Sequence, residues 1–173
     1  VKEFQEEYFS RIALFVDTFV PDSAKNKDYE AFESSLSLAA TISDYLSRQE
    51  YIIDIIAAGP EIFYLQAGRA LAYLDQILDI LAVLNVCRNH PYEKLAPQLM
   101  EDLSQITTVV VLLLGWDPVR HDFLAKLKGM GVELRLFIIT NRKEELDTVS
   151  IRSLFDNVTI VDSEEIEKGF DYL

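Results

Sequence analysis

Two aspartates follow apolar runs that have the composition of buried β-strands. Asp17 comes directly after the run 12–16 (IALFV), and Asp117 follows the run 109–114 (VVVLLL) by three residues. Because parallel strands deliver their carboxyl ends to one edge of an α/β sheet, both carboxylates are expected at the same edge. Carboxylates and hydroxyl groups are the hard oxygen ligands that Mg²⁺ prefers. The two aspartates therefore indicate either a divalent metal site or the remnant of one.

The composition limits the partners and the chemistry that are open to this chain. Its 173 residues, of which 50% are hydrophobic, suffice for one domain with a substantial core. The formal net charge of −13 disfavours binding to nucleic acid and to anionic lipid, because both are negatively charged. Cys87 is the sole cysteine, which excludes an intrachain disulfide and a cysteine-based metal cluster. We expect Cys87 to be a small apolar filler on a helix.

The elements that must position the two aspartates alternate between strand and helix. The spacing of apolar residues, the cap residues and the turn signals predict the order β-α-β-β-α-α-β-α-β-α-β-α. We therefore predict one domain over residues 1–173: a three-layer, doubly wound, mostly parallel six-stranded sheet with one antiparallel edge strand. The predicted strands cover about 10–17, 51–57, 61–66, 107–114, 132–140 and 158–161. The predicted helices cover about 29–49 after Asp28, 68–84, 92–105, 118–129 after Asp117, 151–155, and the acidic segment after Asp162.

Several stretches, taken in this order, resemble one protein family. They are 1–7 (VKEFQEE), 11–18 (RIALFVDT), 29–40 (YEAFESSLSLAA), 71–84, 115–118 (GWDP) with Arg120, and 127–132. The element order is similar to that of the von Willebrand factor A domain. The local sequence resembles a bacterial branch of it, called "domain of unknown function fifty-eight", which is often encoded beside MoxR-type AAA+ ATPases. The resemblance covers nearly the whole chain and implies the same α/β fold.

The resemblance also implies a setting for the domain. In that family the domain follows a pair of membrane helices and a β-rich segment. This chain is then expected to be the soluble C-terminal part of a longer, membrane-associated protein, on the cytoplasmic side. The gene neighbourhood of the family implies a partner or adaptor role beside a MoxR-type AAA+ ATPase and not a catalytic role. We also expect no cofactor.

In this sequence, the first two loops lack ligands that the metal site of the von Willebrand A family requires. The family's first loop carries Asp-x-Ser-x-Ser; here Asp17 is kept, but Phe19 and Pro21 replace the two serines. The second loop of the family supplies a threonine, and residues 66–68 contain none. The hydroxyl ligands of the family's site are therefore missing from this sequence.

The third loop departs from the family pattern as well. Its aspartate position is occupied by Gly115 or Leu114, and Asp117 is displaced by two residues. One fixed carboxylate would hold Mg²⁺ poorly, so we expect no bound metal. Asp17 is then expected to accept backbone N–H bonds from the following loop or a helix N-terminus, or to contact a basic residue of a partner. The alternative is a rearranged metal-dependent ligand site built from Asp17, Thr18, Ser23 and Asp117.

The loops at this sheet edge form the predicted interaction surface. Trp116 is either an exposed interface anchor or a residue that packs over neighbouring loops. Glu164, Glu165 and Glu167 are expected to be solvated, and they could steer a basic partner. The predicted partner-binding residues are Asp17, Thr18, Phe19, Asp22, Gln66, Arg69, Trp116 and Asp117.

Enzymatic alternatives have less support in the sequence. Asp17 and Asp117 could form an acid–base pair, but no motif orients a substrate beside them. His90 and His121 have no local partner at a catalytic spacing and are expected at the surface. The sequence contains no glycine-rich phosphate loop, which argues against nucleotide binding. The predicted function is a non-enzymatic protein-interaction module.

Overall fold

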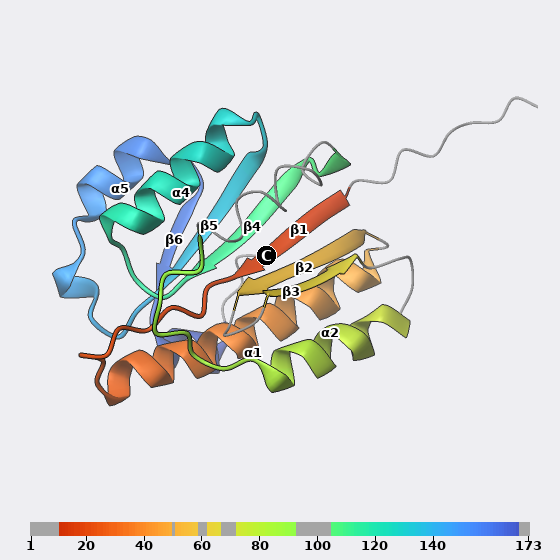
Figure 1. Ribbon diagram of the computed structural model, residues 1–173, viewed down its shortest axis with the longest axis horizontal. Helices are drawn as coiled ribbons and strands as arrows, with labels where there is room; N and C mark the ends of the chain where they lie inside the picture. Colours follow the sequence, from red (N-terminus) through yellow and green to blue (C-terminus); the bar gives the residue numbers. More distant parts are fainter. Residues whose placement is uncertain (1–10, 50, 59–61, 67–71, 93–104, 170–173) are drawn as a thin grey trace, which may run out of the picture.

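The computed structural model describes residues 11–49, 51–58, 62–66, 72–92 and 105–169 (Figure 1). These residues form three layers, in which a six-stranded sheet lies between two sets of helices. The order of the strands across the sheet is β3-β2-β1-β4-β5-β6. The strands are β1 (Arg11–Val16), β2 (Ile52–Ala58), β3 (Ile62–Gln66), β4 (Thr108–Leu113), β5 (Glu133–Ile139) and β6 (Val158–Val161).

Strand β1 lies in the interior of the sheet and pairs in parallel with both β2 and β4. Strands β4, β5 and β6 continue the parallel pairing. Strand β3 is antiparallel to β2 and forms one edge of the sheet. The predicted fold class is confirmed, including the antiparallel edge strand and the order of the strands along the chain.

The helices cover both faces of the sheet. Side chains alternate along β1, so Leu14 packs into the core on one face and Phe15 into the core on the other. The first face is covered by α1 (Asn26–Arg48), α2 (Ala72–Val83) and α6 (Ser163–Lys168), and the second by α4 (Pro118–Gly129) and α5 (Thr148–Leu154). A 3₁₀ turn, η2 (Lys143–Glu145), follows β5. The helix predicted over 92–105 lies almost entirely outside the described residues.

Aspartate side chains stabilise the first turns of several helices. Asp117 caps α4 and Asp162 caps α6, as the sequence predicts. Helix α1 begins at Asn26, three residues earlier than predicted, so Asp28 lies inside its first turn. There the Asp28 carboxylate accepts a hydrogen bond of 2.8 Å from the backbone N–H of Lys25. Asp28 therefore supplies the reciprocal half of a capping box, from the third helical position, instead of being the N-cap itself.

The prediction for Cys87 is wrong in its secondary structure. Helix α2 ends at Val83, and Cys87 lies beyond it in a segment that forms an isolated parallel bridge with Phe19. The Cys87 N–H donates to the carbonyl of Thr18 at 2.7 Å, and its carbonyl accepts from the N–H of Val20 at 2.9 Å. Cys87 therefore acts mainly through its backbone, which holds the loop after β1.

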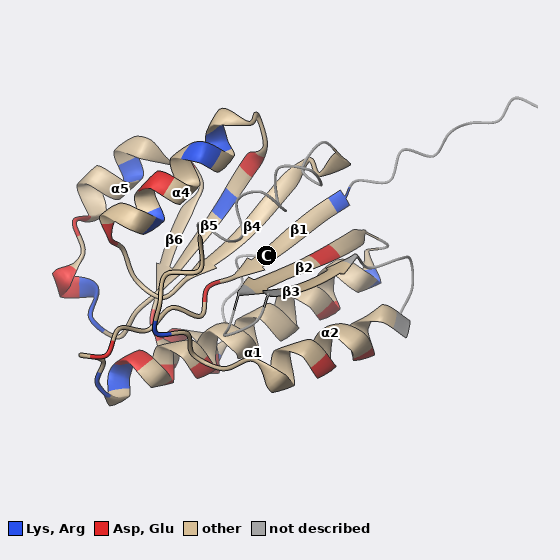
Figure 2. Cartoon of the chain, in the orientation of Figure 1, with Lys and Arg blue, Asp and Glu red and all other residues tan. Residues whose placement is uncertain are grey.

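Charge is unevenly distributed over the helices (Figure 2). Helix α2 carries Asp75 and Asp79 and no basic residue, whereas Lys126, Lys128 and Arg152 lie on α4 and α5. Within the described ranges, no helix is both long enough and apolar enough to cross a membrane.

Candidate functional site

Asp17 lies at the carboxyl end of β1 and is fully buried. Its Oδ1 accepts hydrogen bonds from the Phe19 N–H at 2.9 Å and the Tyr92 hydroxyl at 2.8 Å. Its Oδ2 accepts from the Leu114 N–H at 3.0 Å and from Nε of Arg120 at 2.8 Å. The expectation that Asp17 accepts backbone N–H bonds is confirmed. The basic residue that contacts Asp17 is Arg120 of this chain and not a residue of a partner.

Arg120 connects both strand-end aspartates. Its side chain is 4% exposed, and Nη2 lies 2.7 Å from Oδ2 of Asp17. Nη2 also donates to the carbonyl of Phe19 at 2.8 Å, and Nη1 forms an ion pair with Asp117. The guanidinium carbon lies 5.2 Å from the centre of the Phe19 ring, which is a cation–π distance. One cation is thus bound by two carboxylates and one carbonyl.

Local helix geometry places Arg120 at this position. Asp117 accepts hydrogen bonds of 2.9 Å from the N–H groups of Val119 and Arg120, and Pro118 occupies the first helical position. The buried residues of α4 recur at positions 120, 123, 124 and 127, so Arg120 lies on the stripe that faces the sheet. The helix start therefore directs the arginine inward, beneath the loop that carries Asp17.

The charges of this cluster hold one another in their ionised forms. Burial lowers the pKa of Arg120, but the neighbouring carboxylates of Asp17 and Asp117 outweigh it, and the pKa is raised. Partial burial raises the pKa of Asp117, but the charge and hydrogen bonds of Arg120 outweigh it, and the pKa is lowered. Burial, together with the charge of Asp17, raises the pKa of Tyr92. Asp117 and Arg120 are therefore charged at neutral pH, and Tyr92 is a neutral donor.

The guanidinium of Arg120 is the positive charge that pairs with both strand-end carboxylates at this edge. Carboxylate and carbonyl oxygens are ligands that Mg²⁺ would use, and here they are bound to nitrogen. Within the part of the chain that the structure describes, no group of three or more His, Cys, Asp or Glu residues could hold a metal ion. Of the alternative metal ligands, Thr18 is buried and Ser23 is exposed.

The loop after β1 is also held from its outer side. Nη1 of Arg88 donates to the carbonyls of Val20 and Pro21, and its Nη2 bonds the hydroxyl of Tyr29. The ring of His90 stacks on Phe19 with 3.7 Å between the ring centres. The loop after β1 is therefore fixed both by Arg120 of α4 and by residues 87–90.

The structure revises two of the predicted partner-binding residues at this edge. Asp17 and Thr18 are fully buried, so their side chains offer no surface to a partner. Phe19 is half-buried between Arg120 and His90, whereas the Asp22 side chain is 91% exposed.

Trp116 and Asp117 lie in the loop between β4 and α4. Trp116 is half-buried and makes edge contacts with the rings of Phe155, at 5.8 Å, and His121, at 6.1 Å. Of the two expectations for Trp116, packing over neighbouring elements is the one observed. Asp117 is occupied by the helix cap and by Arg120.

The prediction that Gln66 belongs to the same edge is wrong. Because β3 is antiparallel, Gln66 pairs with Asp54, and Asp54 in turn pairs with Ala13, near the amino end of β1. Asp17 follows Ala13 by four residues, a separation of roughly 13 Å along a strand. Arg69 lies outside the described residues.

Sequence reasoning missed the role of Arg120. It appeared only as part of a motif, and its position on the apolar stripe of α4 was the signal that could have placed it in the site. Tyr92 was missed as well. No local pattern connects it to Asp17, which lies 75 residues earlier.

Comparison with known proteins supports the fold class. No family model matches this sequence, and no curated protein is similar to it in sequence. Among solved structures, the VWA domain of SpRpn10 is similar with a TM-score of 0.53 and 13% identity, over 90% of this chain and 89% of that chain. Proximal thread matrix protein 1 from the mussel byssus gives a TM-score of 0.57 and 11% identity, over 92% of this chain and 43% of that chain.

These structural neighbours define the class of fold to which the described residues belong. The sheet order, the single antiparallel edge strand and the likeness to SpRpn10 are those of a von Willebrand A-like domain. The chain spans less than half of the length of proximal thread matrix protein 1. At these low identities the likeness concerns the fold alone.

Proposed function

We propose that this chain is a non-enzymatic protein-interaction module that binds its partner at the carboxyl edge of the sheet, without a metal ion. The observation that carries the proposal is the buried guanidinium of Arg120 between Asp17 and Asp117. It fixes the loops after β1 and β4 in one arrangement, and a preorganised surface binds with a smaller loss of entropy. Since both carboxylates are bound to an arginine, neither is free to act as an acid or a base.

The surface offered to the partner lies around the loop after β1. Aromatic and arginine side chains are enriched in the energetic centres of interfaces, and this surface combines several of them with exposed apolar and acidic groups. We call it the edge surface, and its members are Phe19, Asp22, Tyr29, Arg88, His90 and Val119.

The particular partner that we propose is a MoxR-type AAA+ ATPase. This step rests on the sequence resemblance to the bacterial family, as does membrane association of the full-length protein with this domain on the cytoplasmic side. The fold neighbours support the general class of interaction module only.

A binding experiment with matched variants tests the edge surface. The full-length protein is captured with its neighbouring MoxR-type ATPase, and Asp22→Arg and Val119→Asp are compared with wild type. Both substituted residues are exposed, so the fold should be retained. The control is Asp156→Arg, an exposed change in the turn between α5 and β6, at the opposite edge. We expect at least ~10-fold weaker binding for the edge variants and unchanged binding for the control.

Four outcomes of this experiment are informative. Binding that survives excess EDTA supports recognition without a metal, and loss of binding in EDTA would favour the rearranged metal site. Edge variants that bind as tightly as the wild type would show that the edge surface is wrong. Failure of the ATPase to bind the wild-type protein would remove that partner.

A further inference from the structure

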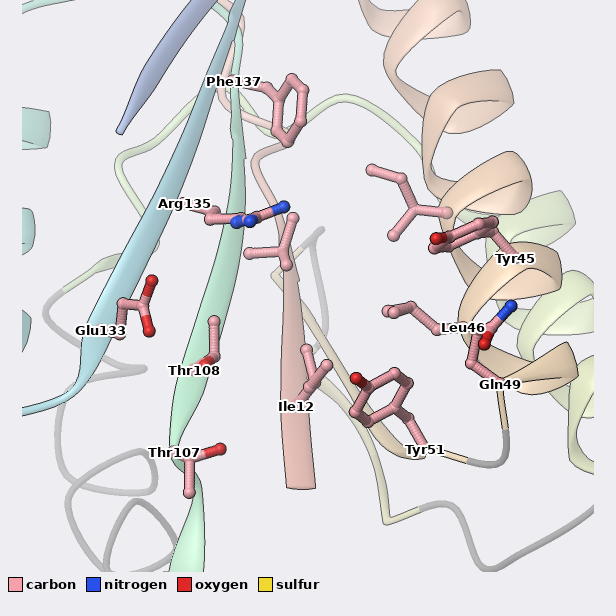
Figure 3. Close-up of a pocket in the computed structure, with 12 residues that line it drawn as sticks. Ile12, Tyr45, Leu46, Gln49, Tyr51, Thr107, Thr108, Glu133, Arg135 and Phe137 are labelled. Carbon is pink, nitrogen blue, oxygen red and sulfur yellow. The ribbon is translucent and has the colours of Figure 1, made fainter. Parts of the chain in front are cut away.

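A second concave site lies at the opposite edge of the sheet, far along the strands from Asp17. It is a cavity of about 410 Å³ between the last turns of α1 and the first residues of β1, β4 and β5 (Figure 3). Ligand pockets for small molecules commonly measure about 300–1,000 Å³. The cavity is therefore large enough for a small organic molecule, and it is separate from the edge surface.

The cavity exists because the helical layer does not cover the start of β5. On the face toward α1, Phe137 and Ile139 are buried, whereas Glu133 and Arg135 are exposed. An interior strand of a sheet with helices on both faces ordinarily carries apolar residues on both sides. Two charged residues in such a strand mark a part of the sheet that remains open. Among the described residues, α6 is too short to cover it, since it ends at Lys168 after six residues.

The floor and the rim of the cavity differ in chemistry. The floor is apolar and is formed by buried side chains such as Ile42, Leu46 and Phe137. At the rim, Tyr45 and Tyr51 are 41% and 38% exposed. Neither tyrosine hydroxyl has a hydrogen-bond partner within the described ranges, so both remain able to donate to a ligand. This combination suits a ligand with an apolar body and one polar end.

Arg135 gives the rim its positive charge. Figure 3 shows its side chain pointing from β5 toward the side of the cavity formed by α1, while Glu133 lies at the margin. Arg11, Arg120 and Arg142 all form ion pairs. Within the described part of the chain, the side chain of Arg135 has neither an ion pair nor a hydrogen bond. A guanidinium that is free of other partners can bind a carboxylate through two parallel N–H bonds.

We propose that this cavity binds a small organic acid with an aromatic or aliphatic body. The carboxylate of the ligand would lie against Arg135 and the tyrosine hydroxyls, and its apolar body against Leu46 and Phe137. The overall charge of −13 would repel such an acid elsewhere on the surface, so the local positive charge of Arg135 decides where it binds. This inference does not depend on the proposed partner at the other edge.

Titration with simple probes tests the proposal. Benzoate and hexanoate are titrated into the protein by calorimetry and ligand-observed NMR, and benzylamine serves as the probe of opposite charge. The test variant is Arg135→Gln. The matched control is Arg152→Gln on α5, since Arg152 is also exposed and, within the described ranges, also lacks an ion pair. We expect saturable binding of the acids, weakened at least ~10-fold by Arg135→Gln and unchanged by Arg152→Gln.

The tyrosines provide a second readout. Tyr45→Phe removes one hydroxyl from the rim and should weaken benzoate binding by roughly 2- to 5-fold, without changing the melting temperature. The proposal is overturned if neither acid binds at millimolar concentration. It is also overturned if benzylamine binds as well as benzoate, or if both arginine variants weaken binding equally.

Discussion

Strand β1 has a buried arginine–carboxylate pair at each of its ends, and the two pairs differ in what they join. At the amino end, Arg11 donates to both oxygens of Asp54 on the neighbouring strand, at 2.7 and 3.2 Å. At the carboxyl end, Asp17 pairs with Arg120 from α4. Both carboxylates are inaccessible to solvent, but the Arg11 side chain is 19% exposed and that of Arg120 only 4%.

The difference accompanies two kinds of surface, an open cavity near the amino end of β1 and a set of fixed loops at its carboxyl end. The amino-end pair links two adjacent strands that the sheet already holds together, and the edge around it keeps an open cavity. The carboxyl-end pair links the loop after β1, the loop after β4 and the start of α4, beyond the last backbone bond between β1 and β4, which the Asp17 N–H donates to the carbonyl of Leu112. A buried ion pair therefore contributes most to shape where it connects elements that are otherwise independent.

Removing Arg120 should cause the largest loss in the free energy of unfolding. Arg120→Met leaves Asp17 buried without its counter-charge, and removing one partner of a buried pair typically costs about 3–5 kcal/mol. Urea unfolding measures the change, and Arg152→Met is the control, with an expected effect below about 0.5 kcal/mol. Adding Asp17→Asn to Arg120→Met should recover part of the loss, because the unpaired charge is gone. A loss below about 1 kcal/mol for Arg120→Met would contradict the central role of this pair.

Removing Arg11 should cost less, although its partner is equally buried. In Arg11→Met, water can reach the partly exposed site and replace part of the lost hydrogen bonding, so we expect about 1–3 kcal/mol. The same unfolding experiment measures it. The contrast between the two ends of β1 would be broken if Arg11→Met cost as much as Arg120→Met.

Asp117 should show a smaller effect that depends on pH. Asp117→Asn keeps an oxygen that can cap α4 but removes the charge beside Arg120, and we expect a loss of about 1 kcal/mol at pH 7. Arg120 holds the pKa of Asp117 below its ordinary value, despite partial burial. A lowered pKa means that this contribution is complete above the unfolded-state pKa of about 4 and is lost as the pH falls through the folded-state value.

The measurement for Asp117 is unfolding of both proteins at neutral and acidic pH. The advantage of the wild type over Asp117→Asn should shrink below about pH 4. An advantage that grew on acidification would have the opposite sign and would argue against the Arg120–Asp117 pair.

Adding a divalent metal ion should change the stability of the protein least of all these tests. With Arg120 in place, millimolar Mg²⁺ or Mn²⁺ should change the melting temperature of the wild-type protein by less than about 1 °C, because an ion that does not bind the folded state cannot stabilise it. Thermal unfolding with and without the salt, at constant ionic strength, tests this. A rise of several degrees would favour the rearranged metal site instead.

The fold could be predicted from the sequence because its signals are local. Apolar runs such as 109–114, the cap at Asp117 and the helical spacing in α1 each specify an element within a few residues. The site depends on contacts between distant residues, and only its strand-end aspartates could be placed. Gln66 was assigned to the wrong edge because it follows a strand, and the antiparallel direction of β3, which brings its end to the opposite edge, was not applied.

Two long-range features did leave a trace in the sequence. Arg120 is a charged residue on an otherwise apolar helix stripe, and Arg135 is a charged residue in an interior strand. In each case the residue breaks the pattern of its own element. Such exceptions point to the places where packing and chemistry compete.

A cation that is covalently part of the chain is bound at every ionic composition of the surrounding solution. Its local concentration is fixed by the tether, so the two carboxylates at this edge keep their positive partner without an ion from solution. A guanidinium enclosed by the protein also leaves no open coordination position for the carboxylate of another molecule. Under the proposed function, a partner that binds here is selected by shape and by contact with side chains, and its binding does not respond to the supply of metal.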